Sequence, residues 1–474
     1  MGNKLSLSAS DRIANLLDDA SFVEVGAYVT ARSTDFNITA KDTPKDGVIT
    51  GYGVINGKLV YVYSQDASVL GGAIGEMHAK KIAGIYDMAM KVGAPVIGLV
   101  DCAGLRLQEA TDAMNAFGEL YLKQTLASGV VPQITAIFGN CGGGAALIPA
   151  LTDFTFMTEE NSRLFVNSPN ALNGNYTAKL DTADAQYLGK NTALVDRICE
   201  DDATLLSEIR ALVDMLPSNN IEDEAAECID DLNRIIPDLD SFSGNARAVL
   251  LNIADNNHFF EVKKDYGSDM VTGFIKLNGA SVGCVANQIE DGNDMISAKG
   301  AELAADFVNF CDAFNIPVLT LVNTKGFVAT VDNEKLMAAA AAKLTYAFAN
   351  ATVPKVTLVM GDAFGTAYTI MNSKAIGADM VYAWPKAKIG TMDPEMAVKI
   401  MYEKEIAEAK DKVAAVDSYK KAYTELQSSA LAAAKRGYID DIIEPDATRK
   451  RVIAAFDMLY SKKEERPYKK HGAV

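Results

Sequence analysis

The sequence predicts an α/β protein built from two copies of one folding unit, and three observations lead to this prediction. First, apolar runs of strand length alternate with stretches of helical spacing from residue 48 onward, which is typical of parallel strands joined by helices. Second, the pattern repeats without a gap, because Gly273 lies 222 positions after Gly51 and Ala367 lies 222 positions after Ala145. Third, each copy has a glycine turn directly after an apolar run. The repeat indicates two homologous domains and not a solenoid.

The first copy is predicted to open with a β-hairpin and to continue as alternating helices and strands. Its hairpin turns at Asn56-Gly57, a dipeptide that favours tight turns. The expected elements, in chain order, are an entry helix at 11–17, strands at 48–57 and 58–66, a helix at 71–91, a strand at 95–100, a helix at about 110–128 and a strand at 131–138.

The second copy repeats this order, and the sequence places the two domains at residues 1–225 and 240–474. The connection between Pro217 and Asn245 is acidic and contains proline, and a short helix is expected within it at 222–236. Residues 392–436 are rich in Ala, Glu, Lys and Met. They predict long helices that form a hairpin on the outside of the second domain.

The two glycine turns are the strongest candidates for a functional site. They are G-N-C-G-G-G-A at 139–145 and G-D-A-F-G-T-A at 361–367, and each is predicted to join a strand to the start of a helix. Glycine lets a backbone approach a ligand closely, and the first turn of a helix offers free N–H groups. Such groups can stabilise a carbonyl oxygen that gains charge, as an oxyanion hole does. The alternative is a tight helix–strand contact, but the recurrence of the turn favours a function.

Composition restricts the function further. The net charge of −17 argues against a general nucleic-acid surface or an anionic membrane face. The six cysteines form no CxxC pair, which suits reduced thiols in a cytoplasmic protein. We expect neither an export signal nor a membrane span. With only three histidines in the chain, a histidine-based metal site is not expected.

Several segments of the chain have counterparts in one enzyme family. They lie at 64–99, 125–134, 149–157, 310–322, 382–390 and 469–472. In these segments the chain resembles the carboxyltransferase subunits of biotin-dependent acyl-CoA carboxylases, and the related transcarboxylases and decarboxylases for methylmalonyl-CoA and glutaconyl-CoA. The resemblance implies two crotonase-like domains of the ββα-spiral type, usually assembled as a hexamer. It also implies that the N-terminal domain holds the acyl-CoA and the C-terminal domain of another subunit holds biotin.

The resemblance implies that each domain supplies one oxyanion hole, built from backbone N–H groups. The residues carried over to the acyl-CoA hole are Gly104, Gly143 and Gly144. Those carried over to the biotin-side hole are Gly326, Phe327, Gly365 and Thr366. The residues expected beside the bound cofactors are Ala103, Arg106, Lys325 and Ala367.

The implied activity is transfer of a carboxyl group between carboxybiotin and the α-carbon of a short acyl-CoA of the propionyl-CoA and methylmalonyl-CoA class. Biotin would arrive on a separate carrier protein, and the coenzyme A thioester would be the substrate. The implied partners are that carrier protein and further subunits, either identical copies or a paralogue. Neither the acyl chain nor the direction of the reaction follows from the sequence.

The chain also departs from the family's usual motifs. Ala103 replaces a glycine and Leu105 replaces an alanine in the first copy, while Lys325 replaces a proline and Thr366 a glycine in the second. Polar and glycine positions are also lost after Phe327. Three explanations stay open: a divergent active carboxyltransferase, a subunit that partners an active paralogue, and a biotin-independent acyl-CoA decarboxylase.

Individual side chains have competing interpretations. Cys102 and Cys141 flank the first predicted hole, where small filler residues are favoured over nucleophiles. Arg106 fits either a coenzyme phosphate or carboxylate contact or a buried ion pair. Lys325 fits either a bound carboxylate or oxyanion or a solvent-facing position. For His78 a packed or capping role is favoured.

Overall fold

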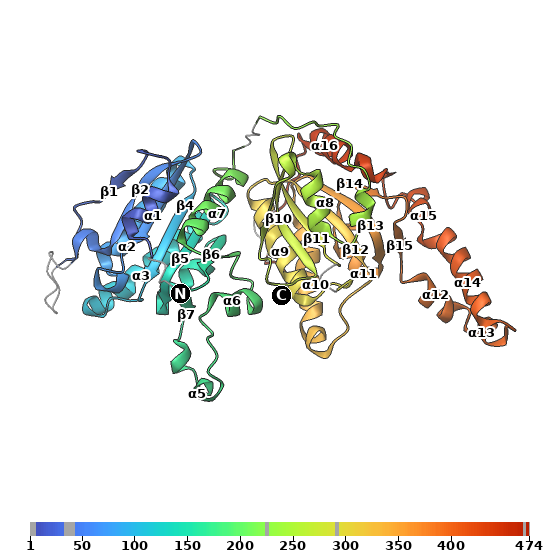
Figure 1. Cartoon of the computed structure of the whole chain (residues 1–474), viewed down its shortest axis with the longest axis horizontal. Coiled ribbons are helices and arrows are strands. Elements are labelled where there is room, and N and C mark those ends of the chain that lie inside the picture. The colour runs from blue at the N-terminus through green and yellow to red at the C-terminus, as the bar shows by residue number, and fades with distance from the viewer. Residues whose placement is uncertain (1–5, 33–42, 223–226, 290–292, 468–470, 474) are drawn as a thin grey trace. The chain divides into compact units, whose positions relative to one another are not determined.

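The computed structural model describes residues 6–32, 43–222, 227–289, 293–467 and 471–473. The chain divides into two compact units, Met1–Asp223 and Glu224–Val474, and each has its own sheet and its own helices (Figure 1). Each unit combines a β-hairpin with parallel strands and crossover helices, so the predicted α/β class is confirmed.

The first unit contains a mixed sheet in the order β1-β2-β3-β4-β5-β6-β8, with β7 paired to β5. Its strands are β1 (Val23–Val25), β2 (Val48–Ile55), β3 (Lys58–Gln65), β4 (Val96–Cys102), β5 (Gln133–Gly142), β6 (Phe154–Thr158), β7 (Arg163–Phe165) and β8 (Arg197–Cys199). Its helices are α1 (Ala9–Leu16), α2 (Glu76–Val92), α3 (Ala110–Ala127), α4 (Leu147–Ala150), α5 (Asn175–Ala178), α6 (Ala185–Asn191) and α7 (Asp202–Met215).

The second unit repeats this plan, with strands in the order β16-β14-β13-β12-β11-β10-β9 and β15 paired to β13. The strands are β9 (Phe259–Val262), β10 (Met270–Leu277), β11 (Ala280–Asn287), β12 (Val318–Thr324), β13 (Lys355–Phe364), β14 (Met380–Ala383), β15 (Lys388–Gly390) and β16 (Asp441–Ile442). The helices are α8 (Ala246–Ile253), α9 (Ala298–Ala313), α10 (Val331–Asn350), α11 (Gly365–Ile370), α12 (Pro394–Met401), α13 (Glu403–Glu408), α14 (Lys412–Tyr423), α15 (Ala430–Lys435) and α16 (Thr448–Leu459).

The register of the hairpins confirms the internal repeat. Val48 pairs with Gln65 in the first unit, and Met270 pairs with Asn287 in the second, 222 positions further along. The predicted turn at Asn56-Gly57 has positive φ at both residues, as a two-residue hairpin turn requires. The central parallel strands are buried on both faces, which explains why they consist of continuous apolar runs.

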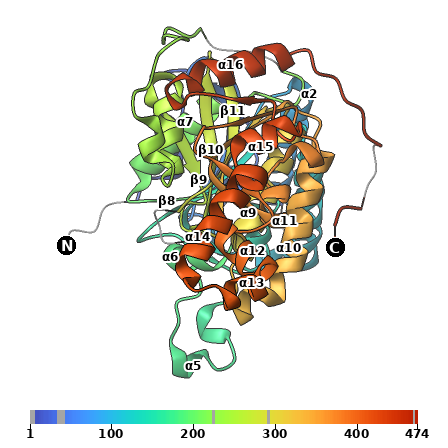
Figure 2. The same ribbon diagram turned by 90° about the vertical axis from the view of Figure 1, so that its right-hand side faces the viewer.

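Two expectations about connecting segments need correction. Residues 227–236 contain no helix, so the described part of the predicted helix at 222–236 is wrong. The segment after residue 392 forms the predicted hairpin, but from short helices, because Asp393 and Asp411 cap new helix starts. Tyr402 and Tyr419 stack across this hairpin with ring centroids 4.2 Å apart. Figure 2 shows α12, α13 and α14 on the outer side of the second unit.

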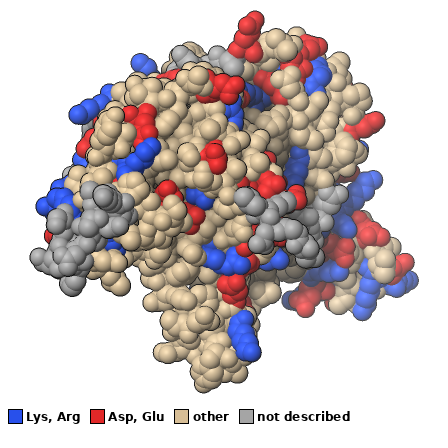
Figure 3. All heavy atoms as spheres, turned by 60° about the vertical axis from the view of Figure 1, so that its left-hand side comes forward, with Lys and Arg blue, Asp and Glu red and all other residues tan. Residues whose placement is uncertain are grey.

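The surface carries both signs of charge. Figure 3 shows acidic and basic side chains interspersed over the visible face, without a broad basic region. This distribution agrees with the net charge of −17. Among the described residues, no helix combines the length and the apolar character that a membrane span requires.

Candidate active site

The loop after β4 forms the first half of the candidate site. Gly104 has a φ of +114°, and a side chain there would place its Cβ 3.0 Å from the carbonyl oxygen of Gly142. Both features require glycine, because other residues rarely adopt such a φ and would collide with the backbone. The carbonyl of Gly104 accepts a hydrogen bond from Ile74 N (2.9 Å), and Arg106 N donates to Ile74 O (3.0 Å). The loop is therefore fixed against the segment before α2.

This bonding shows which N–H group of the loop is available. Because Gly104 O and Arg106 N both face Ile74, the intervening N–H of Leu105 points the opposite way. The N–H of Gly104 itself donates to Cys102 Sγ at 3.2 Å. The geometry therefore assigns Gly104 to shaping the turn and makes Leu105 the donor candidate. The sequence could have indicated Leu105, since it lies 222 positions before Phe327.

The glycine turn after β5 forms the second half. Gly143 has a φ of +59° and begins the short 3₁₀ helix η4 (Gly143–Ala146), which leads into α4. The first turn of a helix leaves its N–H groups without intrahelical acceptors. The hydroxyl of Tyr121 donates to Gly144 O at 2.7 Å and fixes this turn from α3. Cys102 pairs with Cys141, and a Cβ added at Gly104 would meet Gly142 O, so the structure brings the two predicted turns together.

The second unit reproduces the same frame. Ile296 N donates to Gly326 O (2.9 Å) and Val328 N donates to Ile296 O (3.0 Å), so the N–H of Phe327 corresponds to that of Leu105. The N–H of Gly326 donates to Thr324 Oγ1 at 3.4 Å, as Gly104 donates to a cysteine. The backbone arrangement has therefore been retained where the side chains have changed.

The second glycine turn opens α11. Gly365 has a φ of +61°, close to that of Gly143. Thr366 is exposed at the first turn, whereas the side chain of Ala367 is buried (1% exposed) and packs into the core. Ala367 was expected beside the cofactor, and its methyl group faces away from solvent here.

Ala103, the departure nearest the first hole, causes no backbone strain. It is absent from the described residues with positive φ, and its N–H donates to Gly71 O at 2.9 Å. The glycine usual at this position is therefore not needed for conformation. The side chain of Ala103 is exposed at the loop.

Arg106 forms the buried ion pair that the sequence left open as the alternative to a coenzyme contact. Its side chain is 0% exposed and lies 2.5 Å from Asp46 Oδ1 and 2.7 Å from Glu109 Oε1. A second guanidinium nitrogen donates to Ala73 O at 2.9 Å. Both terminal nitrogens of the guanidinium are bonded within the protein and the side chain is buried, so the expectation of a ligand contact for Arg106 is corrected.

Lys325 lies at the loop of the second unit, half exposed. Its Nζ is 2.7 Å from Asp294 Oδ2, and its backbone N donates to Asp294 O at 2.8 Å. The hydrogen bond to the Asp294 carboxylate raises the pKa of Lys325, with smaller contributions from Asp362 and Asp393. Lys325 therefore carries a positive charge that a carboxylate already balances.

Burial excludes a nucleophilic thiol at the first site. It raises the pKa of Cys102 to about 11 and that of Cys141 well above its usual value. Both are therefore small packing residues, as favoured from the sequence. Burial lowers the pKa of His78 to about 3, and the ring nitrogens of His78 contact Asp46 O (2.9 Å) and Gln65 Nε2 (3.1 Å). His78 is thus a packed, neutral histidine.

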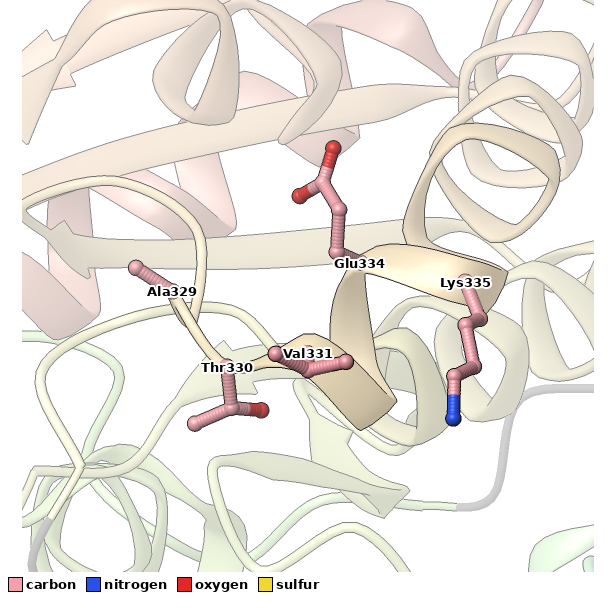
Figure 4. A pocket seen from close by; sticks show the side chains of 5 residues that line it. All are labelled: Ala329, Thr330, Val331, Glu334 and Lys335. Atoms are coloured by element: carbon pink, nitrogen blue, oxygen red, sulfur yellow. The ribbon is translucent and has the colours of Figure 1, made fainter.

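A shallow pocket of about 490 Å³ lies beyond the Gly326 loop, at the start of α10 (Figure 4). It is lined by Ala329, Thr330, Val331, Glu334 and Lys335. Most of this lining comes from the segment in which the chain departs from the family's motif. No group of acidic, cysteine or histidine side chains among the described residues is arranged to hold a metal ion.

The paired units and their matching backbone turns define a two-domain protein of the crotonase-like fold. A profile described as the carboxyl transferase domain matches residues 3–474. The chain therefore belongs to the carboxyl transferase family, which confirms the resemblance found in the sequence.

Two curated relatives and one solved structure illustrate this relationship. The methylmalonyl-CoA decarboxylase subunit alpha of Propionigenium modestum is 42% identical over 484 residues, covering 99% of this chain and 93% of that one. The propionyl-CoA carboxylase beta chain of Cereibacter sphaeroides is 42% identical over 483 residues, with the same coverage. The structure of transcarboxylase 12S, with methylmalonyl-CoA bound, superimposes with a TM-score of 0.90 at 36% identity, covering 98% of this chain and 92% of that one.

Proposed function

We propose that this protein transfers a carboxyl group between carboxybiotin and the α-carbon of a short acyl-CoA of the propionyl-CoA and methylmalonyl-CoA class. Family membership and the names of the relatives support this substrate class. The methylmalonyl-CoA bound to transcarboxylase 12S supports it as well. The observation that carries the proposal is the pair of matching backbone turns, one in each unit.

In the first unit, the N–H groups of Leu105 and the Gly143 turn would hold the thioester oxygen. That oxygen gains negative charge as the substrate forms an enolate, and fixed N–H donors stabilise the charge without reorganising. Each donor would contribute roughly 3–4 kcal/mol to the transition state. A side chain at Gly104 would meet the Gly142 carbonyl, so glycine at this position lets the two backbone segments lie close together.

In the second unit, the N–H groups of Phe327 and the Gly365 turn would hold the biotin ureido oxygen. The retained frame around Gly326 fits this role, because its hydrogen bonds match those of the first unit. Carboxybiotin, when bound, supplies the carboxyl group and the base for the α-proton. The protein therefore needs to orient the reactants and stabilise two oxygens, and no acid–base side chain is required.

The proposed assembly brings a first unit of one chain to a second unit of another. Transcarboxylase 12S assembles as a hexamer, which supports a hexamer of this chain. Biotin would be presented by a separate carrier protein, as the family implies. Light scattering of the purified chain tests the assembly directly, and a stable monomer would contradict it.

The second candidate function is that of a subunit in a mixed assembly with an active paralogue. Lys325 and Thr366 favour it, because they stand where the family has a proline and a glycine. The retained backbone frame of the second unit favours an active site instead.

Purification separates the two candidates. We expect the chain alone to transfer the carboxyl group of methylmalonyl-CoA to free biotin, leaving propionyl-CoA, and to show no turnover without biotin. Turnover without biotin would identify a biotin-independent decarboxylase. Turnover that appears only after a paralogous subunit is added would support the mixed assembly.

A further inference from the structure

A buried cluster of charged side chains, Arg106, Asp46 and Glu109, anchors the loop that would hold the thioester oxygen. None of these side chains takes part in the proposed reaction. Arg106 directly follows Leu105, and its guanidinium is completely buried. It donates to Asp46, to Glu109 and to the carbonyl of Ala73. These partners come from separate segments, namely η1 (Pro44–Gly47), η3 (Leu107–Glu109) and the connection before α2. One side chain therefore joins the parts of the chain that surround the loop.

The backbone on both sides of Leu105 is fixed by the same arrangement. Gly104 O and Arg106 N are both bonded to Ile74, at 2.9 and 3.0 Å. Ile74 directly follows Ala73, whose carbonyl accepts from the Arg106 side chain at 2.9 Å. The Arg106 side chain is therefore bonded to the same segment whose backbone sets the direction of the Leu105 N–H.

Glu109 connects the cluster to α2. One of its oxygens lies 2.7 Å from the Arg106 guanidinium, and the other accepts from Glu76 N at 2.6 Å. Gly75 precedes the helix and offers no side chain to cap it, so Glu109 takes this role. Gly75 also leaves room for the cluster, because a Cβ there would lie 2.4 Å from Glu109 Oε1. The loop is thereby tied to a long helix of the core.

The described residues of the second unit form no equivalent charged cluster at the Gly326 loop. Val328 occupies the position of Arg106, and the corresponding helix α9 is capped by Ser297, whose side chain accepts from Gly300 N. The side chain of Asn333 accepts from Ala298 N at 2.7 Å and donates to Val328 O at 2.8 Å. In the second unit a neutral amide therefore connects the loop to the start of the helix, as the Glu109 carboxylate does in the first unit. A buried ion pair adds little net stability compared with apolar packing, so stability alone does not account for the cluster. The asymmetry therefore needs an explanation specific to the first loop.

We propose that Arg106, with Asp46 and Glu109, is the positioning group of the first hole and aims the Leu105 N–H at the thioester oxygen of an acyl-CoA. This inference rests on the proposed function, because it assumes that the first loop binds a thioester. Arg106 does not touch the substrate and acts through the backbone of its neighbour. Hydrogen bonds weaken steeply as the N–H turns away from its acceptor, and a misplacement of about 1 Å near the reacting atoms can cost about 100-fold in rate.

The test compares Arg106→Met with wild-type protein by infrared spectroscopy of bound propionyl-CoA carrying a ¹³C-labelled carbonyl. A well-aimed donor polarises the carbonyl and lowers its stretching frequency. We expect the wild-type protein to lower this frequency relative to free propionyl-CoA and Arg106→Met to lose most of the shift. We further expect kcat with methylmalonyl-CoA to fall about 100-fold in the variant, the loss typical of a misplaced reacting group.

Arg449→Met is the matched control. Arg449 is also 0% exposed, pairs with Asp255 at 2.6 Å and donates to Ile253 O at 2.6 Å, but lies in the second unit. Its loss should lower thermal stability without changing the carbonyl frequency. Arg106→Lys keeps the charge but loses the forked geometry, so partial recovery of the shift is expected. Glu109→Gln, which keeps an oxygen for Glu76 N, should weaken the shift less than Arg106→Met.

Two outcomes would overturn the inference. A folded Arg106→Met protein with the full wild-type carbonyl shift would show that Arg106 is structural only. An equal loss of shift in Arg449→Met would show that general destabilisation is responsible. Failure of the proposed function is distinguishable, because wild-type protein would then neither bind propionyl-CoA nor shift its carbonyl.

Discussion

At the scale of single residues, the conformation of each glycine decides which substitutions can test the site. Gly143→Pro would delete a hole donor, but Gly143 has a φ of +59° and proline is fixed near −65°. That substitution would change the turn as well as the N–H group. Gly144 has no such constraint, since it is not among the positive-φ glycines.

Gly144→Pro should therefore abolish carboxyl transfer in a folded protein if this turn is a hole. Proline is tolerated in the first helical turn, where its missing N–H breaks no helical bond. Loss of one donor typically costs about 100-fold to 1000-fold in kcat. Gly144→Ala is the control, because it keeps the N–H while placing a Cβ 3.1 Å from the Tyr121 hydroxyl. Equal rates for the alanine and proline variants would remove this turn from the site.

Ala110 is a residue whose backbone prefers glycine. Its φ of 47° and ψ of −117° lie outside the regions that alanine favours. The side chain is exposed, so its removal leaves no cavity. Ala110→Gly should therefore stabilise the first unit by about 1 kcal/mol, measured by denaturant unfolding. The matched control is Ala342→Gly, in the exposed interior of α10, which should destabilise the second unit by a similar amount. Destabilisation by both substitutions would show that the backbone at Ala110 is not strained.

His78 should make the protein less stable in acid. Burial lowers its folded pKa to about 3, whereas an unfolded histidine titrates near its usual value of 6.5. The unfolded state therefore binds the extra proton between these values, and stability falls as the pH decreases through this window. We expect His78→Gln to flatten the pH dependence by up to about 1.4 kcal/mol per pH unit. His258→Gln, at an exposed position, is the control. If the free energy of unfolding changed with pH equally in His78→Gln and in wild-type protein, the prediction would be contradicted.

At the scale of elements, an aromatic contact helps to hold the helical hairpin of the second unit together, beside the ion pair of Lys420 with Glu395. Tyr402 and Tyr419 are stacked with an interplanar angle of 4°. Tyr419→Ala should remove about 1 kcal/mol of stabilisation and raise amide exchange in α12 and α14 about fivefold. Exchange in the strands of the same unit should stay unchanged, since their core is separate. Uniform acceleration across the unit would show that the hairpin does not open independently.

The elements also show what the sequence can and cannot predict. The hairpin turn and the buried parallel strands follow from local patterns. Asn56-Gly57 strongly favours a two-residue hairpin turn, and continuous apolar runs are typical of parallel strands buried on both faces. The division into short helices after residue 392 does not follow from composition, because caps such as Asp411 interrupt a helix without changing its overall residue content. A backbone donor such as Leu105 leaves no side-chain signature, so only its repeat position, 222 residues before Phe327, could indicate it from the sequence.

At the scale of the whole molecule, the internal repeat carries more information than any single motif. It predicts that Gly326 and Gly365 reproduce Gly104 and Gly143. In the structure, Gly326 O and Gly104 O accept matching hydrogen bonds, and Gly365 and Gly143 have nearly the same φ. The partners of Arg106 could not be predicted, because Asp46 lies 60 residues away and only the folded chain brings them together. Duplication therefore preserved the backbone frame, while the side chains that support each turn diverged.

The last prediction concerns the independence of the two units. Each unit buries its own apolar core, with Ile82, Phe117 and Val100 in one and Val249, Leu321 and Trp384 in the other. Fragments 1–222 and 227–474, produced separately, should each unfold cooperatively in calorimetry, because a core of this kind supports folding alone. Neither fragment should transfer carboxyl groups by itself, since each would contain one hole. Mixing them should restore some activity if the holes meet between units. A fragment that stays unfolded would show that the compact units are not autonomous domains, whereas full activity in one fragment would contradict the two-hole arrangement.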